Sequence, residues 1–235
     1  MRLDKYVSRF APSRSEAKKL IKSGRVKVDG AEAKDPGLII DENNAAVELD
    51  GKRIEYKEFI YIMMNKPAGV ICATEDTRHK TVIDLLPEEY KRFMPFPVGR
   101  LDIDTEGLLL LTNDGQLAYK LLSPKYKVPK RYISVLDSGI NDSHIAKFRE
   151  GIVLSDGYRT KPALLSRVDG DCEVSVTIAE GKFHQIKRMF ADIDRTVLYL
   201  KRVEFASLPL DPLLEKGQSR ELSPKERDIL DKIMQ

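Results

Sequence analysis

The 235-residue sequence has no tryptophan, only two cysteines and few aromatic residues, 7% in all. Cys72 and Cys172 lie far apart and match no metal-ligand spacing, so we expect two free thiols in a reducing cytosol and no structural zinc. No stretch approaches the roughly 18–20 apolar residues that a membrane span needs. The charged N-terminal segment does not resemble a secretory signal. These absences predict a cytoplasmic protein with no membrane partner.

Motifs for common cofactors are also absent. The sequence contains no GxGxxG, Walker A, HExxH or CxxC pattern, and it has no internal repeat or low-complexity tract. We therefore expect neither a cofactor nor a bound metal. The length allows one large or two modest domains.

Net charge is small but unevenly distributed. The whole chain carries only +3, which argues against a histone-like polycation. Residues 1–30, however, contain nine basic and three acidic residues, a net charge of +6, so the remaining 205 residues carry −3. Any single one of these basic residues would be taken for part of a solvated helix face. As a cluster on a near-neutral chain they indicate polyanion binding.

The same segment has the pattern of a small folded module. Ser13 and Glu16 have the spacing of a capping box, which predicts a helix from there to Gly24. Residues 25–28 alternate like a strand, and Asp29-Gly30 predicts a tight turn after it. A shorter helix before Ser13 is predicted by apolar residues at helical spacing, namely Leu3, Tyr6, Val7 and Phe10.

This succession, RLDKYVSRF followed by SRSEAKKLIKSGRVKVDG, resembles the S4 RNA-binding domain. The resemblance covers about the first 50 residues and implies a small αL-like domain that binds structured RNA through the basic side of its two helices. The polar stretch around Asp50–Lys57 would then be the linker. The RNA contacts that we predict in this domain are Arg2, Lys5, Arg14, Lys18, Lys19 and Arg25.

The rest of the chain mixes strand and helix patterns without a regular βαβ rhythm. Strands are predicted from Phe59 to Lys66, over Arg131–Leu136 and over Glu173–Ile178. Helices are predicted across Thr81–Leu86 and after Gly115, Asn141 and Lys182. We expect an α+β fold with a mixed, largely antiparallel sheet flanked by helices, divided into residues 1–57 and 58–235.

An acidic loop is the most informative part of this second region. In VGRLDIDTEGLLLLTNDG, a loop with Asp102, Asp104 and Glu106 comes directly before an apolar strand. Buried strands usually exclude carboxylates, so a loop that presents three of them at a sheet edge is a candidate site. An ordinary acidic turn would explain a lone Asp-x-Asp equally well. The Asp-x-Asp-x-Thr string also occurs in haloacid-dehalogenase-type phosphatases, but there the hydrophobic strand precedes the acids, whereas here it follows them.

Four ordered segments resemble the pseudouridine synthases, in the branch typified by the enzymes of ribosomal small-subunit RNA. They are YIMMNKPAGV from Tyr61, GRLDIDTEGLLLLTNDG from Gly99, KRYISV from Lys130 and EGKFHQIKRM from Glu180. These enzymes break the bond between N1 of uracil and C1′ of the ribose and rejoin C5 to the same carbon. Nothing is added or removed, which agrees with the expected lack of a cofactor.

The resemblance implies three catalytic residues. Asp102 is the carboxylate that acts on the sugar, either by attack on C1′ or by removal of a sugar proton to give a glycal, and the sequence leaves both routes open. Tyr132 offers a ring on which uracil can stack and a hydroxyl that could remove the C5 proton. We predict the stacking role, because a phenol is a poor base near neutral pH. Lys187 is the cation expected to keep Asp102 ionised, at a position where the family often has arginine with its two-pronged geometry.

Further substrate contacts are expected around these three. On the helix predicted after Lys182, an apolar stripe of Phe183, Ile186, Phe190 and Ile193 would leave the polar residues free to face substrate. The predicted RNA contacts of this region are Arg100, Lys130, Lys182, His184, Gln185 and Arg188.

These inferences predict a monomeric enzyme whose partner is ribosomal RNA, most simply 16S RNA or a 30S assembly intermediate. Two alternatives stay open. A large-subunit 23S RNA synthase of the same branch differs in few motif residues. A ribosome-assembly factor that only grips RNA would need no catalytic residues, which the set of Asp102, Tyr132 and Lys187 argues against.

Overall fold

The computed structural model describes residues 1–234. It divides into two compact units, one of Met1–Phe59 with Glu88–Phe93 and one of Ile60–Pro87 with the residues from Met94 on. We call them the N-terminal domain and the sheet domain. The predicted boundary between residues 57 and 58 lies two residues before this division.

Two helices of the N-terminal domain begin and end as local chemistry dictates. The Ser13 hydroxyl accepts a hydrogen bond from the Glu16 amide at 3.1 Å and begins α2, and Gly24, with φ +75°, follows its end. The other half of the expected capping box is missing, because the Glu16 carboxylate binds Lys19 instead, at 2.6 Å. The helices are α1 (Leu3–Val7), followed by a short 3₁₀ turn (Ser8–Phe10), and α2 (Arg14–Lys22).

The sheet of this domain extends into the expected linker. Its antiparallel order is β2-β1-β3-β4, with β1 (Val26–Val28), β2 (Ala31–Glu32), β3 (Val47–Leu49) and β4 (Lys52–Ile54). The prediction of a linker around Asp50–Lys57 was therefore wrong over β4, because Asp50 and Gly51 both have positive φ and turn the chain back onto β3. Tyr6 reinforces this strand, since its hydroxyl donates to the Ile54 carbonyl at 3.0 Å.

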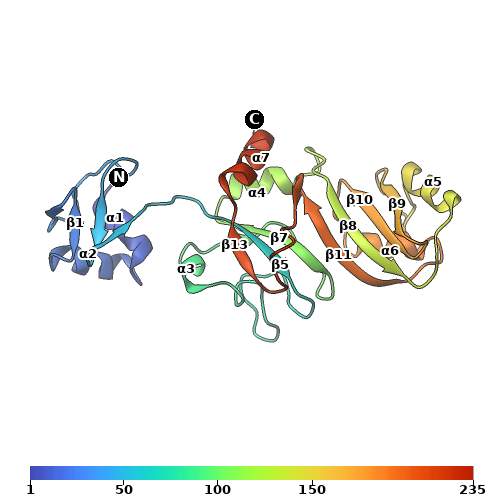
Figure 1. Cartoon of the computed structure of the whole chain (residues 1–235), viewed down its shortest axis with the longest axis horizontal. Coiled ribbons are helices and arrows are strands. Elements are labelled where there is room, and N and C mark those ends of the chain that lie inside the picture. Colours follow the sequence, from blue (N-terminus) through green and yellow to red (C-terminus); the bar gives the residue numbers. More distant parts are fainter. Residues whose placement is uncertain (235) are drawn as a thin grey trace. The chain divides into compact units, whose positions relative to one another are not determined.

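The sheet domain contains a nine-stranded mixed sheet, as expected for the fold class (Figure 1). Its main path runs β13-β5-β7-β11-β8-β10-β9, with β6 beside β7 and β12 beside β11. Among the strands described, only β7 and β11 pair in parallel. The strands are β5 (Tyr61–Lys66), β6 (Phe96–Pro97), β7 (Glu106–Thr112), β8 (Lys130–Leu136), β9 (Leu164–Asp169), β10 (Glu173–Ile178), β11 (Val197–Phe205), β12 (Leu208–Pro209) and β13 (Ser219–Glu221).

Helices cover the sheet in two groups, as Figure 1 shows. The pair α4 and α7 lies by the β5 end of the sheet, and α5 and α6 lie by the β9 and β10 end. The predicted helices after Gly115 and Asn141 are confirmed. The helices that follow β5 along the chain are α3 (Glu88–Lys91), which belongs to the N-terminal domain, and α4 (Gly115–Leu122), α5 (Asp142–Glu150), α6 (Gln185–Ala191) and α7 (Pro224–Met234) of the sheet domain.

One helix prediction was wrong, and another was wrong at its start. Thr81–Leu86 forms turns, because the Thr81 amide and hydroxyl both bind the Asp84 carboxylate, at 2.7 and 3.0 Å, and Pro87 disfavours helical geometry before it. α6 begins only at Gln185, because His184 has left-handed backbone geometry with φ 48°.

The apolar core of the sheet domain is split into two clusters. The first packs α6 and part of α5 on β8 and β10, and includes Tyr132, Phe148 and Phe190. The second packs α4 and α7 on β5 and β7, and includes Leu108 and Phe205. Tyr132 and Phe205 come from neighbouring strands, so the two clusters meet at β8 and β11.

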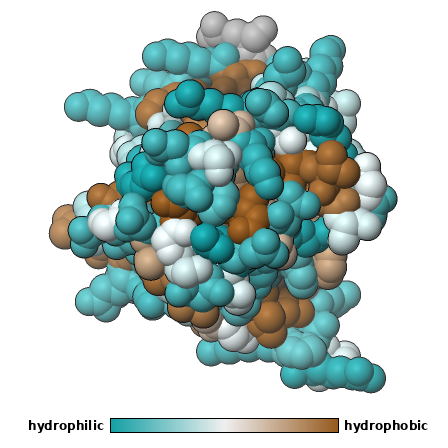
Figure 2. Space-filling model, turned by 90° about the vertical axis from the view of Figure 1, so that its right-hand side faces the viewer, coloured by the Kyte–Doolittle hydropathy of each residue, from teal (hydrophilic) through white to brown (hydrophobic). Residues whose placement is uncertain are grey.

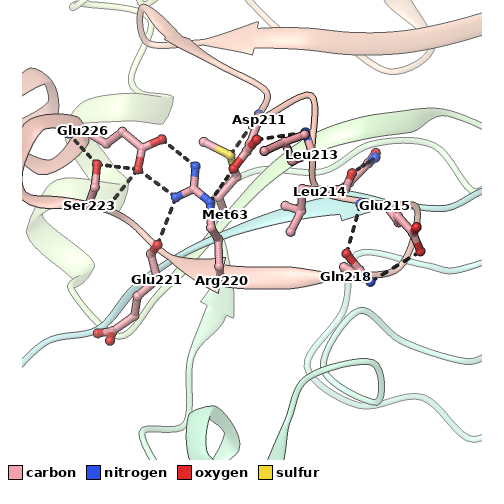
Figure 3. Close-up of polar contacts among 11 residues, drawn as sticks. Met63, Asp211, Leu213, Leu214, Glu215, Gln218, Arg220, Glu221, Ser223 and Glu226 are labelled. Carbon is pink, nitrogen blue, oxygen red and sulfur yellow. Dashed lines mark hydrogen bonds and ion pairs between the residues drawn. The ribbon is translucent and has the colours of Figure 1, made fainter.

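A polar network ties the C-terminal segment to the sheet (Figure 3). Arg220 of β13 binds Asp211 at 2.7 Å and Glu226 of α7 at 2.8 Å, and it lowers the pKa of Glu226 to about 2. The Asp211 amide also contacts the Met63 sulfur of β5 at 3.5 Å. This network fixes α7 and the loop before β13 against the sheet.

The surface at the β9 end of the sheet domain is mostly hydrophilic, with small patches of hydrophobic residues between the polar ones (Figure 2). None of the helices in the described part of the chain is both long and apolar enough to cross a membrane. Cys72 and Cys172 are free, as predicted.

Candidate active site

A cleft of about 610 Å³ opens in the sheet domain where the two apolar clusters meet. Strands β8 and β11, the acidic loop and the segment before α6 form its walls. It brings together five of the predicted site residues, and a smaller adjoining hollow adds His184, Gln185 and Lys187. Those lining the main cleft are Arg100, Asp102, Lys130, Tyr132 and Lys182.

Lys66, the last residue of β5, binds the backbone of the acidic loop that carries Asp102. This side chain is fully buried, and its ammonium group donates to the backbone carbonyls of Pro67, Asp102, Ile103 and Thr105 at 2.9–3.3 Å. Burial lowers the pKa of Lys66. Four carbonyls around one cation fix the loop backbone on which Asp102 stands.

Two further contacts fix the same loop. The Leu101 amide donates to the Cys72 sulfur at 3.3 Å, and the Gly69 amide donates to the Ile103 carbonyl at 2.8 Å. After the loop, Gly107 has φ +100°, and a Cβ there would collide with the Arg202 backbone of β11. The close approach of β7 and β11 therefore requires glycine at this position.

Asp102 is partly buried, with 28% of its side chain exposed. Its carboxylate lies 3.7 Å from the Lys187 ammonium and 3.7 Å from His184 Nε2. Lys187 lies closer to Asp104, at 2.6 Å, and this contact lowers the pKa of Asp104. Lys187 thus contacts both carboxylates, and the expected contact with Asp102 is the longer of the two. A lysine can be shared in this way because its charge has no fixed orientation.

The segment before α6 differs from the predicted apolar stripe. Ile186, Phe190 and Ile193 are buried, but Phe183 is 72% exposed and stacks on the His184 ring at 3.8 Å. The prediction for Phe183 was wrong because α6 starts two residues after it. Phe183 instead lines the cleft.

Two other predicted contacts of this helix are already engaged within the protein. The Gln185 side chain is buried, donates to Glu180 at 2.8 Å and accepts from the Lys182 amide at 2.9 Å. Arg188 pairs with Asp156 at 2.6 Å. Gln185 therefore ties the Lys182 backbone to the Glu180 side chain at the wall of the site.

Tyr132 is only 7% exposed and lies on β8 opposite Arg202 of β11. Lys130, two residues earlier, is 8% exposed and donates to the Val128 carbonyl at 2.9 Å. Burial and the nearby Arg202 and Lys161 lower the pKa of Lys130 to about 8. The floor of the cleft thus combines an aromatic ring with two buried basic groups.

Glu106, the first residue of β7, is bound by other side chains of the protein. Its carboxylate accepts from the Tyr199 hydroxyl at 2.7 Å and from Lys216 at 2.9 Å. Burial alone would raise the pKa of Glu106, but these two bonds lower it. The bond to Glu106 also contributes to the raised pKa of Tyr199, after burial.

Lys66 and Arg202 were missed as site residues. Lys66 lies in the Asn-Lys-Pro-x-Gly segment, so a signal was present, but nothing in the sequence says that its amine binds the acidic loop. Arg202 has no motif around it. Its place in the cleft follows only from the pairing of β8 with β11.

The six basic residues that we predicted as RNA contacts in the N-terminal domain are exposed and partly paired. Asp4 is fully buried and binds Arg2 and Arg14, at 3.2 and 3.0 Å, with Lys18 at 4.0 Å, and hydrogen bonds from the two arginines lower its pKa to about 2. Asp4 therefore holds three cations on one surface. Lys19 pairs with Glu16, Arg25 pairs with Asp50, and Lys5 is exposed.

Two family models match the chain. The RNA pseudouridylate synthase model matches residues 60–192, and the S4 domain model matches residues 1–45.

Relatives match over nearly the full length. An uncharacterized RNA pseudouridine synthase of Bacillus subtilis, YtzG, is 47% identical over 98% of both chains. The ribosomal small subunit pseudouridine synthase A of Vibrio parahaemolyticus is 41% identical over 97% of this chain and 98% of its own. The ribosomal large subunit pseudouridine synthase B of Bacillus subtilis is 39% identical over 91% of this chain and 88% of its own.

A solved structure agrees in fold as well. A crystal structure of a pseudouridylate synthase is 34% identical and superposes with a TM-score of 0.69, covering 98% of this chain and 99% of that one. The site geometry, the family models and these relatives lead to one conclusion: the chain belongs to the RNA pseudouridylate synthase family and carries an S4 domain at its N-terminal end.

Proposed function

We propose that this enzyme converts uridine to pseudouridine in ribosomal RNA, with 16S RNA or a 30S assembly intermediate as its substrate. One observation carries the proposal: Asp102 and Tyr132 line the same cleft, and the Asp102 carboxylate lies 3.7 Å from the Lys187 ammonium group. The small-subunit target is supported by the relative of that name, whose identity and coverage slightly exceed those of the large-subunit relative.

The proposed reaction uses the cleft in three steps. The N1–C1′ bond breaks, and its electron pair stays with N1 of the detached uracil. The base turns, C5 bonds to C1′, the C5 proton is released and N1 takes up a proton. Asp102 acts at the sugar, by attack on C1′ or by removal of a ribose proton, and Tyr132 holds the base by stacking.

Charged residues around the cleft would hold the RNA backbone. Arg100 and Lys182 are exposed and line the cleft, so they are placed to meet phosphates on either side of an extruded nucleotide. Extruding a base from folded RNA costs about a few kcal/mol, which such contacts offset.

The S4 domain would add affinity for structured RNA. We assign residues 1–57 to RNA binding and residues 58–235 to catalysis, in a monomer that works in the cytoplasm, where ribosomal RNA matures. Sedimentation of the pure protein tests the monomer. The exposed cations around Asp4 support the RNA-binding role, because clustered cations release counterions from RNA and bind it in a salt-dependent way.

The deciding experiment measures tritium release from 16S and 23S transcripts, and from 30S assembly intermediates, labelled at uridine C5. We expect release from a small-subunit substrate and none from the Asp102→Asn protein, whose RNA affinity should be unchanged. Release that survives Asp102→Asn would overturn the catalytic assignment.

Two other outcomes decide between the alternatives. Release from 23S RNA alone would establish a large-subunit enzyme. RNA binding without release from any of these substrates would establish a non-catalytic assembly factor.

A further inference from the structure

The floor of the cleft holds two buried cations that no carboxylate balances. Arg202 is 2% exposed and Lys130 is 8% exposed. In the described part of the chain, neither forms an ion pair with an acidic residue. Burial of an unpaired charge is unfavourable, so such a pair at the floor of a cleft calls for an explanation.

Their positions are fixed by the strand register. Arg202 lies opposite Tyr132, and Lys130 lies opposite Phe205, across the β8–β11 pair. Both charges lie over the Phe205 ring, the Arg202 guanidinium carbon at 4.7 Å and the Lys130 nitrogen at 5.2 Å from its centroid. Residues directly opposite on antiparallel strands share a face of the sheet, and so do residues two apart on one strand. Arg202 and Lys130 therefore lie on the same face as Tyr132 and flank the ring that we assign to uracil stacking.

Contacts within the protein use only part of this pair. Arg202 Nε donates to the Leu108 carbonyl at 2.7 Å, which ties it to β7, but its buried Nη2 has no hydrogen-bond partner among the described residues. Lys130 donates once, to Val128, although an ammonium group has three protons. A purely structural role would leave donors and two charges unmatched.

We propose that Arg202 and Lys130 stabilise the negative charge on uracil while the base is detached from the sugar. This inference rests on the proposed function. When the N1–C1′ bond breaks, the electron pair that stays on N1 is delocalised onto the carbonyl oxygens O2 and O4. Two cations fixed beside the stacked ring lower the energy of this anion without any rearrangement, as preorganised charges do in other active sites.

The depth of the pair favours the base over a phosphate as its ligand. A phosphate is joined to nucleotides on both sides, so it stays near the mouth, where Arg100 and Lys182 are exposed. The base is the one part of a nucleotide that can reach groups only 2% and 8% exposed.

The test compares uridine with 5-fluorouridine at the target position. Fluorine withdraws electrons, so 5-fluorouracil is a weaker base and departs with less need for nearby cations. Single-turnover cleavage of the N1–C1′ bond is measured at saturating RNA, as loss of the unmodified nucleoside after digestion. The variants are Arg202→Gln and Lys130→Gln. The control is Lys201→Gln, because Lys201 precedes Arg202 on β11 and its side chain lies on the opposite face of the sheet.

We expect Arg202→Gln to slow uridine cleavage roughly 100-fold. The same variant should slow 5-fluorouridine cleavage only roughly tenfold. Lys130→Gln should show the same pattern, Arg202→Lys should recover part of the loss, and Lys201→Gln should match the parent protein. Thermal unfolding verifies that each variant is folded. If Arg202→Gln fails to fold, Lys130→Gln decides the question.

Equal losses on the two nucleosides would overturn the inference. Such losses together with weaker RNA binding and a smaller salt slope would assign the pair to a phosphate instead. An inactive parent protein on every ribosomal substrate would instead refute the proposed function, so the two failures are distinguishable.

Discussion

The N-terminal domain and the sheet domain both carry cations suited to RNA, but they place them differently. In the first, side chains such as Arg14, Lys18 and Lys19 are 49–71% exposed, and neighbouring acids hold several of them. In the second, Lys66, Lys130 and Arg202 are at most 8% exposed. Exposed charges act on the RNA from a distance and are screened by salt, whereas buried charges act on what enters the cleft and are screened much less.

The buried cations also differ from one another. Lys66 has four carbonyl acceptors within 3.3 Å, so its hydrogen bonds are saturated and its role is to hold the acidic loop. Arg202 and Lys130 retain unused donors. A buried cation with saturated donors supports the fold, and one with unused donors is available to a ligand.

Lys66→Met should produce the largest effect, because it leaves the carbonyls of the acidic loop without their partner. We expect a loss of about 3–5 kcal/mol in the free energy of unfolding and roughly a 1000-fold loss of tritium release in any protein that remains folded. Urea unfolding and single-turnover assays measure the two. A stable variant with parental activity would show that the loop holds its shape unaided.

Replacing Lys5, Lys18 and Lys19 together by glutamine should weaken RNA binding by roughly tenfold or more and reduce the salt slope by about two to three. The single-turnover rate at saturating RNA should not change. The matched control replaces three exposed cations of the sheet domain, Lys147, Arg149 and Lys225. Equal effects of both triple variants would remove the distinction between the domains.

The pH profile should report Lys130. Burial and two neighbouring cations lower its pKa to about 8, so it is charged below that pH and loses its charge above it. We expect kcat/KM to fall roughly threefold to tenfold between pH 8 and 9, and the fall to vanish in Lys130→Arg, which stays charged. An unchanged profile in that variant would assign the fall to another group.

Glu226→Gln should change stability without changing activity, the smallest effect. Because Arg220 lowers the pKa of Glu226 to about 2, the carboxylate stabilises the fold above its ordinary pKa, and this contribution is lost as pH falls toward 2. We expect the variant to be less stable by about 1–3 kcal/mol at pH 7 and the difference to shrink in acid. Thermal unfolding from pH 7 to 2 measures it, and a difference independent of pH would argue against the ion pair.

The parts that the sequence predicted are those decided by local chemistry. Ser13, Gly24 and Asp29-Gly30 act on adjacent backbone, so the ends of α2 and the following hairpin could be predicted. The errors came from local competition that the apolar pattern does not reveal. Thr81 and Asp84 bind each other and prevent a helix, and the left-handed His184 delays the start of α6.

The site could be predicted only as far as its motifs extend. Asp102, Tyr132 and Lys130 were named from two segments, and the structure places them around one cleft. Arg202 lines that cleft because the β8–β11 register places it opposite Tyr132. Lys187 lies closer to Asp104 than to Asp102 because of the orientation of α6. Both depend on contacts between segments 70 to 85 residues apart, which spacing along the chain does not encode.

We expect the exposed cations to govern RNA affinity and the buried cations to govern the reaction. RNA affinity and the saturated single-turnover rate, measured side by side over a range of salt, test this division for the parent, the Lys5/Lys18/Lys19 triple variant and Arg202→Gln. The triple variant should lose RNA affinity and salt slope at an unchanged rate, and Arg202→Gln should lose rate at an unchanged affinity. Parallel losses of affinity and rate in both proteins would contradict it.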